Sequence, residues 1–304
     1  MKINLQDSTT ITWIIILTII LVAIGYSGFA IHHQPTQMSF TVDENYKFPY
    51  QFQENEWRVE VPDALKEISG ITPLDNEHVL AINDEKGILY TVDLNAGNIV
   101  NEILFDKDRD YEDLCKVANQ VFILERDGDL YQFDLENQDT ILKFETIFNY
   151  RNDTEGLCFD SKKNRLLIAY KEGSPEGIVL PKNTVAVFGF DLLKKTVSPV
   201  PVISIPKKEI GRIVGNGGKP YNFKPSAIGI HPHSGNLYVL SSVGKILIIV
   251  NPNNNKILYV ELLDGQQFTQ PEGIAFDENE NLLISCEGMD QAGFISKFKG
   301  LPHH

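Results

Sequence analysis

The chain has 304 residues, 42% of them hydrophobic, which is enough to bury a sizeable core in one large domain or two smaller ones. Its formal net charge is −14, and Lys2 and Asp7 are the only charged residues before Met38, so the excess of acid belongs to the rest of the chain. Such a surface repels phosphate backbones, which argues against nucleic acid as a partner and suits cations or cationic partners.

The first thirty residues predict a membrane anchor. Residues 8–31 carry no charge, and Ile, Leu, Val and Ala dominate residues 11–30. A helix of that length, at about 1.5 Å per residue, crosses a hydrocarbon core of about 30 Å. Lys2 precedes the stretch and no Lys or Arg follows before Lys47, so the positive-inside tendency places the N-terminus in the cytoplasm. We expect residues 1–31 to be a single-pass anchor in the cell membrane, with the domain on its periplasmic or extracellular side.

A cleaved signal peptide is the alternative, because Gly28-Phe-Ala30 is an acceptable small-x-small cleavage site. The domain would then be secreted. Residues 32–45 are predicted to be a polar linker, which leaves residues 46–304 for the folded domain.

Five places in that domain share a turn, a small residue and a short apolar strand. The third residue of each repeat is called the anchor here, and the five anchors are Ser69, Glu112, Glu155, Ser226 and Glu272. Their spacings are 43, 43, 71 and 46 residues. A period in the forties with several short strands per unit is typical of a β-propeller. The sequence therefore predicts an all-β propeller of five four-stranded blades.

The last repeat holds three strand-like runs before the chain ends. Residues 57–61 lie before the first anchor and can supply the fourth strand, which would close the ring and leave no open edge. A six-bladed alternative would need residues 40–53 and the extra residues of unit three to build another blade.

One column of small residues supports this alignment. Three positions after the anchors stand Thr72, Cys115, Cys158, Gly229 and Ala275. Inner strands crowd around the axis of a propeller, and close packing there punishes excess volume. The three cysteines, Cys115, Cys158 and Cys286, are therefore expected to be buried small residues and not a disulfide framework.

The long third step comes from two insertions, at residues 172–183 and 206–223. Both should lie on the face of the ring that carries the anchors, called the mouth face from here on. The glycine-rich residues 215–218 do not match a phosphate-binding loop, because no Gly-Lys-Ser/Thr follows and no helix pattern starts there. We expect a mobile cover beside the channel mouth.

The anchors should meet the ends of the second strands at the mouth of the channel, and those ends are Asp84, Glu125, Lys171, Ser242 and Glu287. Carboxylates so close together raise one another's pKa values unless a cation lies between them. Oxygen ligands in this number suit calcium or magnesium. The alternatives are that the acids cap inner-strand amides, or that one of them is a catalytic acid or base.

The order Asp110-Tyr-Glu-Asp-Leu114, Asp153-Thr-Glu-Gly-Leu157, Lys224-Pro-Ser-Ala-Ile228 and Gln270-Pro-Glu-Gly-Ile-Ala-Phe-Asp277 resembles the SdiA-regulated (YjiK-type) propeller family. The resemblance covers roughly residues 65–299. It implies a membrane-tethered extracytoplasmic domain without an established activity. Related propellers with Glu-Gly inner strands include phytases and calcium-dependent lactonases, which implies a divalent ion at Glu112, Glu155 and Glu272. This chain departs from the pattern at its two serine anchors and at Asp113, where glycine would be expected.

Two functions are compatible with these features. The first is a binding or scaffold module, with a protein or small-molecule ligand at the mouth face. The second is a metal-dependent hydrolase of an ester, lactone or phosphate, phytase-like or gluconolactonase-like, with Glu125 or Glu287 as acid or base. The chain shows no Ser-His-Asp order, and only Lys171 is placed to meet an anionic substrate. No catalytic residue is assigned, and fold alone cannot decide between the two classes.

Overall fold

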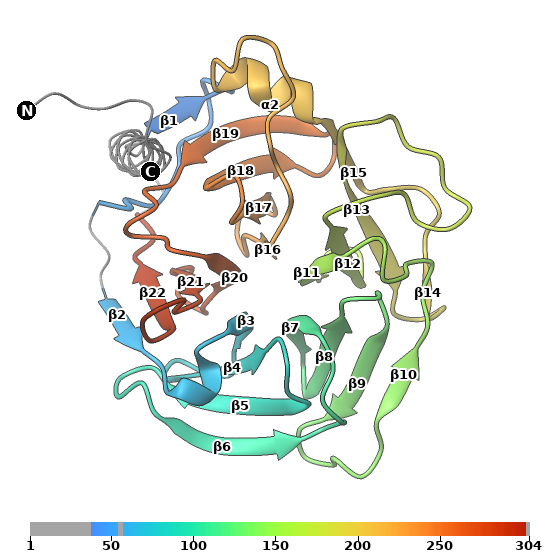
Figure 1. Cartoon of the computed structure of the whole chain (residues 1–304), viewed down its shortest axis with the longest axis vertical. Coiled ribbons are helices and arrows are strands. Elements are labelled where there is room, and N and C mark those ends of the chain that lie inside the picture. The colour runs from blue at the N-terminus through green and yellow to red at the C-terminus, as the bar shows by residue number, and fades with distance from the viewer. Residues whose placement is uncertain (1–37, 54–56, 302–304) are drawn as a thin grey trace, which may run out of the picture. The chain divides into compact units, whose positions relative to one another are not determined.

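The computed structural model describes residues 38–53 and 57–301, which form a ring of five antiparallel sheets (Figure 1). The predicted anchor over residues 1–31 lies outside these ranges. Among the described residues, none of the helices has the length and apolar character needed to cross a membrane. The prediction of an all-β propeller with five blades is confirmed.

Each blade begins beside the central channel and proceeds outward strand by strand. Blade 1 consists of β3 (Ile68–Pro73), β4 (His78–Asn83), β5 (Ile88–Asp93) and β6 (Ile99–Leu104). Blade 2 consists of β7 (Tyr111–Val117), β8 (Gln120–Glu125), β9 (Leu130–Asp134) and β10 (Leu142–Phe144). Blade 3 consists of β11 (Thr154–Asp160), β12 (Arg165–Tyr170) and β13 (Thr184–Asp191), with β14 (Thr196–Val197) and β15 (Ile203–Pro206) both pairing with β13.

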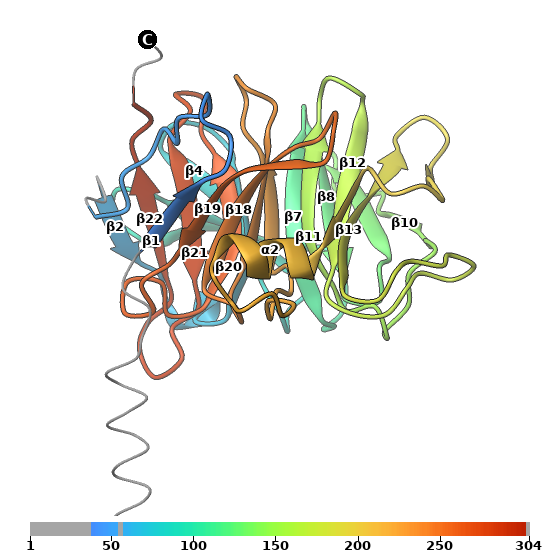
Figure 2. The same ribbon diagram turned by 90° about the horizontal axis from the view of Figure 1, so that it is seen from above.

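Blade 4 consists of β16 (Ala227–Ile230), β17 (Leu237–Ser241), β18 (Ile246–Asn251) and β19 (Lys256–Leu262). Blade 5 contains β20 (Pro271–Phe276), β21 (Leu282–Cys286) and β22 (Phe294–Phe298). Figure 2 shows the blades from the side, with their strands running between the two faces of the ring. The first strands of neighbouring blades contact each other around the axis.

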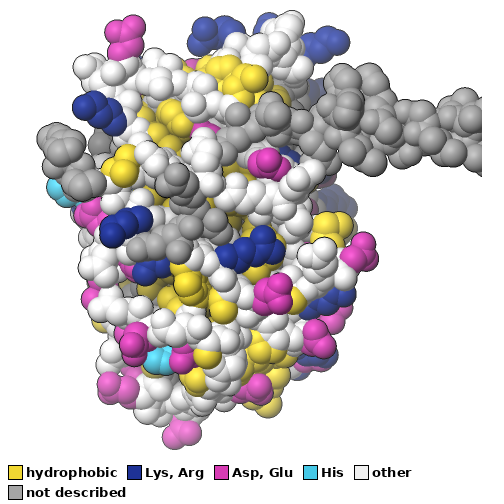
Figure 3. Space-filling model, turned by 90° about the vertical axis from the view of Figure 1, so that its left-hand side faces the viewer, with side chains coloured by type: hydrophobic (Ala, Val, Ile, Leu, Met, Phe, Trp, Pro, Cys, Tyr) yellow, Lys and Arg dark blue, Asp and Glu magenta, His cyan; other side chains and the backbone are white. Residues whose placement is uncertain are grey.

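Closure of the ring follows the prediction. Strand β2 (Trp57–Glu60) pairs antiparallel with β22, from Trp57 opposite Lys297 to Glu60 opposite Phe294. A 3-10 turn, η1 (Asp63–Leu65), then leads into blade 1. The first and last segments of the domain are thereby joined in one sheet, which gives blade 5 its fourth strand and pairs the outer edge of β22. Acidic and basic side chains are interspersed on this side of the ring (Figure 3).

The six-bladed alternative is wrong. Strand β1 (Met38–Thr41) pairs with β19 as a fifth strand of blade 4 and builds no new sheet. Phe52 lies 4.8 Å from Phe298 and 5.3 Å from Phe268 between ring centroids, inside the core shared by blades 4 and 5. Residues 38–41 lie within the segment predicted as a linker, although Met38, Phe40 and Val42 alternate there with polar residues as in a strand. The extra strand gains its stability from the sheet that it joins.

The hydrophobic core consists of five layers between adjacent blades. Cys115, Cys158 and Cys286 are buried and free, as expected. At Gly229 an added Cβ would lie 3.1 Å from the ring of Phe276 on the next blade. The small column therefore lies where the blades pack most closely, and volume is the reason for it.

The insertion at residues 206–223 contains a helix that its sequence did not predict, α2 (Lys207–Ile213). Its residue Ile210 and the later Phe223 are fully buried in the core between blades 3 and 4. From α2 at the outer edge of the ring the chain returns to β16 beside the channel (Figure 1). The helix has only seven residues, and Ile210 is its one buried apolar side chain, so its sequence shows no helical periodicity. Its stability comes from packing against the rest of the domain.

Candidate functional site

Four of the five anchors are bulged residues in the innermost strands. The pairing register shifts by one residue at Ser69, Glu112, Glu155 and Glu272, each of which has no partner opposite on the second strand. The fifth anchor, Ser226, stands just before β16 begins. A bulge bends the strand locally and redirects one side chain. The repeated sequence pattern thus directs one polar side chain per blade towards the channel.

The two serine anchors join neighbouring blades. Ser69 Oγ donates to the Tyr111 carbonyl at 2.9 Å, and Ser226 Oγ donates to the Pro271 carbonyl at 2.8 Å. Those carbonyls belong to the innermost strand of the neighbouring blade. They lie on the edge of that strand with which no other strand pairs. At these two positions a hydroxyl that links neighbouring blades thus stands in place of a carboxylate.

Asp113, where glycine would be expected, also links two neighbouring blades. Its side chain is 2% exposed, and its two oxygens accept from the backbone amides of Leu114 at 2.8 Å and Leu157 at 2.6 Å. Leu157 belongs to the innermost strand of blade 3, so this carboxyl group connects blades 2 and 3. Burial raises the pKa of Asp113 well above its usual range. On the other side, a Cβ on Gly70 would lie 2.6 Å from Asp113 Oδ1, so glycine there makes room for it.

Replacing Asp113 with Ala should destabilise the protein by about 1–3 kcal/mol, because the buried Leu157 amide loses its acceptor. For a domain of this size, that corresponds to a fall of about 2–10 °C in melting temperature. Asp113→Asn keeps the shape and one acceptor, and should lose less. Equal melting of Asp113→Ala and the wild type would contradict the role of this link between blades.

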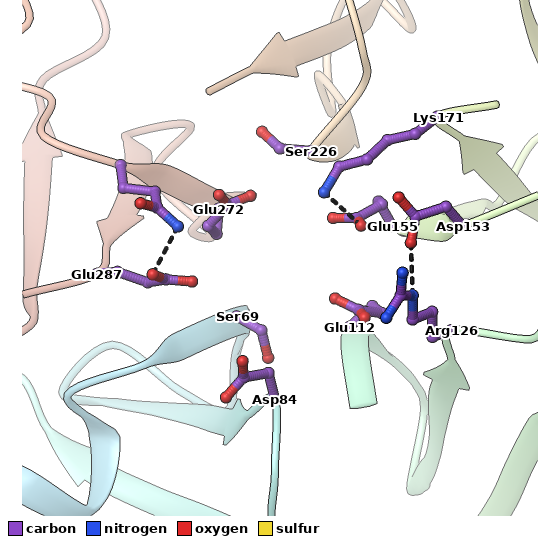
Figure 4. Close-up of a pocket in the computed structure, with 11 residues that line it drawn as sticks. Ser69, Asp84, Glu112, Arg126, Asp153, Glu155, Lys171, Ser226, Glu272 and Glu287 are labelled. Atoms are coloured by element: carbon purple, nitrogen blue, oxygen red, sulfur yellow. Dashed lines mark hydrogen bonds and ion pairs between the residues drawn. The ribbon is translucent and has the colours of Figure 1, made fainter. Parts of the chain in front are cut away.

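The anchors surround a polar cavity of about 250 Å³ at the mouth of the channel (Figure 4). Its lining contains every predicted site residue except Glu125 and Ser242. The full lining is Ser69, Asp84, Glu112, Arg126, Asp153, Glu155, Lys171, Ser226, Gln270, Glu272 and Glu287. Six carboxyl groups and two basic groups therefore share this space, which we call the acidic cavity.

Glu125 was placed at the mouth by a register error of one residue. In the ladder, Glu125 is opposite Tyr111, the residue before the anchor, as Asn83 is opposite Ile68 and Tyr170 opposite Thr154. The residue after each second strand faces the channel, and in blade 2 that residue is Arg126. A shift of one position along a strand turns a side chain to the other face. The basic Arg126 consequently replaces the expected acid.

The side chain of Glu125 is held away from the cavity by three neighbours. Arg109 Nη1 lies 3.0 Å from its Oε1, while the Tyr131 hydroxyl at 2.7 Å and Lys143 Nζ at 3.3 Å reach its Oε2.

Among the described residues, Glu125, Asp127 and Asp129 have carboxylate oxygens close enough together to share an ion. Lys143 Nζ also lies 2.7 Å from Asp129, so an ammonium group already lies against two of these three carboxylates. Ser242 stays close to the acidic cavity, since its amide donates to Ser226 Oγ at 3.2 Å.

Three residues of the acidic cavity were missed, namely Arg126, Asp153 and Gln270. Asp153 and Gln270 both stand two positions before an anchor, as Asp110 does in blade 2, so the repeat itself contained the signal. Arg126 would have followed from the correct strand register. Arg126 Nε lies 2.6 Å from Asp153 Oδ1, and Gln270 Nε2 donates to Glu287 Oε2 at 2.6 Å.

Charge is unevenly distributed around the acidic cavity. Lys171 Nζ is 2.5 Å from Glu155 Oε1, and Arg126 pairs with Asp153, so both basic groups of the cavity lie on the side formed by blades 2 and 3, where Glu112 is the third acid. Glu272 and Glu287 of blade 5 and Asp84 of blade 1 lie across the cavity from Lys171 (Figure 4). Asp84 Oδ1 and Glu272 Oε2 are buried and have no hydrogen-bond partner among the described protein atoms. An unpaired buried carboxylate oxygen is expensive. Within the described part of the chain, no basic side chain of blades 5 or 1 lines the cavity, and the positive charge that acts on Glu272 from this side is that of Lys245, outside the lining.

The pKa values reflect this deficit. Burial raises the pKa of Glu112 to about 8, against the opposing effect of Lys171. Burial and the Glu272 charge raise the pKa of Glu287 to about 8, and burial with the Glu67 charge raises that of Asp84 to about 6. The pKa values of Glu155 and Glu272 are also raised, chiefly by burial. The cavity therefore retains protons at neutral pH unless another cation replaces them.

Several solved structures resemble the chain at low sequence identity. The glutaminyl cyclase of Myxococcus xanthus matches 81% of this chain and 95% of its own, with a TM-score of 0.53 and 12% identity. A luciferin-regenerating enzyme matches 88% of this chain and 96% of its own, at a TM-score of 0.48 and 12% identity. The virginiamycin B lyase of Staphylococcus aureus matches 80% and 73%, at a TM-score of 0.43 and 13% identity. Likeness at this level concerns the fold alone.

No curated protein matches the sequence of the chain. A family model does match, and it covers residues 48–289, a range that includes all five anchors and every residue lining the acidic cavity. The chain belongs to the SdiA-regulated family.

Proposed function

We propose that the chain is a membrane-tethered, extracytoplasmic binding propeller whose acidic cavity holds a calcium ion. The observation that carries the proposal is the pair of unpartnered buried oxygens, Asp84 Oδ1 and Glu272 Oε2, on the same side of that cavity. Calcium takes six to eight oxygen ligands in flexible geometry, and carboxylates are its usual ligands. Magnesium is the second candidate for the same donors. The apolar residues 11–30 support the tether, and the domain would face outward with the mouth face as its docking surface.

The ligand set differs from the one implied by the resemblance. Glu112 and Glu272 remain in it, and Asp84 and Glu287 join them from the uncompensated side. Glu155 is paired with Lys171, so it would approach the ion only if that pair opened. The ion would supply fixed positive charge, which would stabilise blades 1, 2 and 5 against the repulsion of their own carboxylates.

Replacing Glu272 with Gln tests the proposal by the sign of its effect. In chelator the variant should melt higher than the wild type, because it removes a buried charge from an uncompensated acidic cluster. On addition of calcium, the wild type should gain several degrees by mass action and the variant much less. Glu102→Gln removes the same charge from the exposed outer strand β6 and should leave the calcium response unchanged. If calcium, magnesium and chelator all leave the wild-type melting curve unmoved, no ion binds in the cavity.

The alternative, a metal-dependent hydrolase of an ester, lactone or phosphate, is favoured by one observation. The pKa of Glu287, raised to about 8 by burial and Glu272, is near the value that suits a general acid or base at neutral pH. Glu125, the other candidate, lines no part of the acidic cavity. Catalysis would need Glu287 to keep its proton beside the ion, whereas a structural ion would hold Glu287 ionised.

A further inference from the structure

A second cavity, of about 470 Å³, lies beside the acidic cavity between the two insertions of blade 3. Its lining includes four lysines, Lys171, Lys182, Lys207 and Lys224, and a single acid, Glu172. Lys171 also lines the acidic cavity, so the two spaces are neighbours. In a chain with a net charge of −14, a pocket with this local excess of positive charge is unusual. We call it the lysine pocket.

The lysines are not equivalent. Lys171 pairs with Glu155, and Lys224 Nζ pairs with Glu172 Oε1. Within the described residues, neither Lys182 nor Lys207 makes an ion pair. Lys207 is only partly exposed, and burial together with the nearby charge of Lys224 lowers its pKa. A half-buried ammonium beside another ammonium is unfavourable, and a bound anion would relieve that cost.

The other walls suit a small organic molecule more than a lone ion. Tyr170, Leu180 and Pro181 contribute apolar surface to the same lining. The volume falls within the range of small-molecule sites, about 300–1,000 Å³, and such sites combine apolar walls with a few polar groups that fix orientation. Lysine is a common point-charge partner of phosphate and other oxyanions.

We propose that the lysine pocket binds a small organic ligand through an oxyanion, a phosphate or a carboxylate, held between Lys207, Lys182 and Lys224. The acid Glu172 competes with that oxyanion for Lys224. The ligand therefore enters beside the acidic cavity but does not require a metal ion. This site goes beyond the calcium site proposed above, and each can fail without the other.

Titration calorimetry with inorganic phosphate, and separately with acetate, at constant ionic strength and in the presence of chelator, tests the proposal. Lys207→Gln should weaken phosphate binding about 10-fold, since it removes one charge-assisted hydrogen bond. Lys208→Gln changes the next residue on α2, which is exposed and does not line the pocket, and should bind phosphate as the wild type does. Comparing phosphate with acetate distinguishes the two oxyanions.

Glu172→Gln should have the opposite effect and tighten phosphate binding several-fold, because it releases Lys224 and removes a repulsive charge. Glu176→Gln, on the same insertion but outside the pocket lining, is its matched control. If Lys207→Gln does not fold, Lys182→Gln on an exposed side chain should still weaken binding. Absence of phosphate and acetate binding, or equal binding by all these variants, would overturn the proposal, whatever the outcome with calcium.

Discussion

A chain that begins at residue 62 should melt at least about 10 °C below one that begins at Trp57, or fail to remain soluble. The two differ only by β2 and Val61. Loss of β2 exposes the full edge of β22, and it removes Trp57 and Val59 from the core shared by blades 5 and 1. Val61 is 4% exposed, and its amide donates to the Gly293 carbonyl at 2.8 Å.

Comparison of these two start points isolates closure from the other N-terminal contacts, because both lack β1 and the aromatic residues 46–52. A third chain beginning at residue 37 measures what those contacts add. Thermal melting followed by circular dichroism is sufficient for all three. If the chains beginning at 57 and 62 melt together, β2 does not hold the ring closed.

Without metal, the protein should lose stability as the pH rises from about 5 to about 9. The pKa values of Glu112 and Glu287 rise from the ordinary 4.5 to about 8 on folding. The folded state thus binds more protons than the unfolded state between those values. The stabilisation is fully present below the unfolded pKa and is lost as the pH rises through the folded pKa. Asp84, whose pKa is raised to about 6, contributes the earlier part of the decline.

The melting temperature measured in chelator across this pH range checks the expectation. Glu112→Gln should flatten the decline above pH 7, while the exposed Glu102→Gln should not, which separates a local effect from the repulsion of the whole acidic surface. Saturating calcium should abolish the decline in the wild type, because the ion replaces the protons. A melting temperature that is constant or rises between pH 7 and 9 in chelator would show that the cavity carboxyls are not protonated.

The repeat predicted most of the fold because each blade has the same local requirements. One polar anchor must lie at the channel, a small residue must follow where blades pack, and alternating apolar residues must fill the layers between sheets. Closure by residues 57–60 was predictable from the same reasoning, since a blade with three strands leaves an edge. Helix α2 was not, because its stability comes from packing against elements distant in sequence. The alternation of residues 38–43 marks a strand, but it does not show that β1 joins β19.

The site was less predictable than the fold. An error of one residue at the end of β8 exchanged Glu125 for Arg126 and reversed the sign of a charge at the channel mouth. The sequence also could not show that Lys171 reaches Glu155 at 2.5 Å while Glu272 keeps an unpartnered oxygen. Equivalent positions in the five repeats specify which side chains converge at the channel mouth. The pairing among them depends on side-chain length and direction in three dimensions.

Calcium titration calorimetry of the metal-free protein at pH 7 tests the account most directly, repeated in two buffers of different ionisation heat. We expect one calcium ion per chain, with release of about one proton or more as Glu112 and Glu287 ionise. Glu272→Gln should weaken the affinity, and proton release should disappear at pH 9. Absence of calcium binding at both pH values, or binding that Glu272→Gln leaves unchanged, would contradict a calcium site in the acidic cavity.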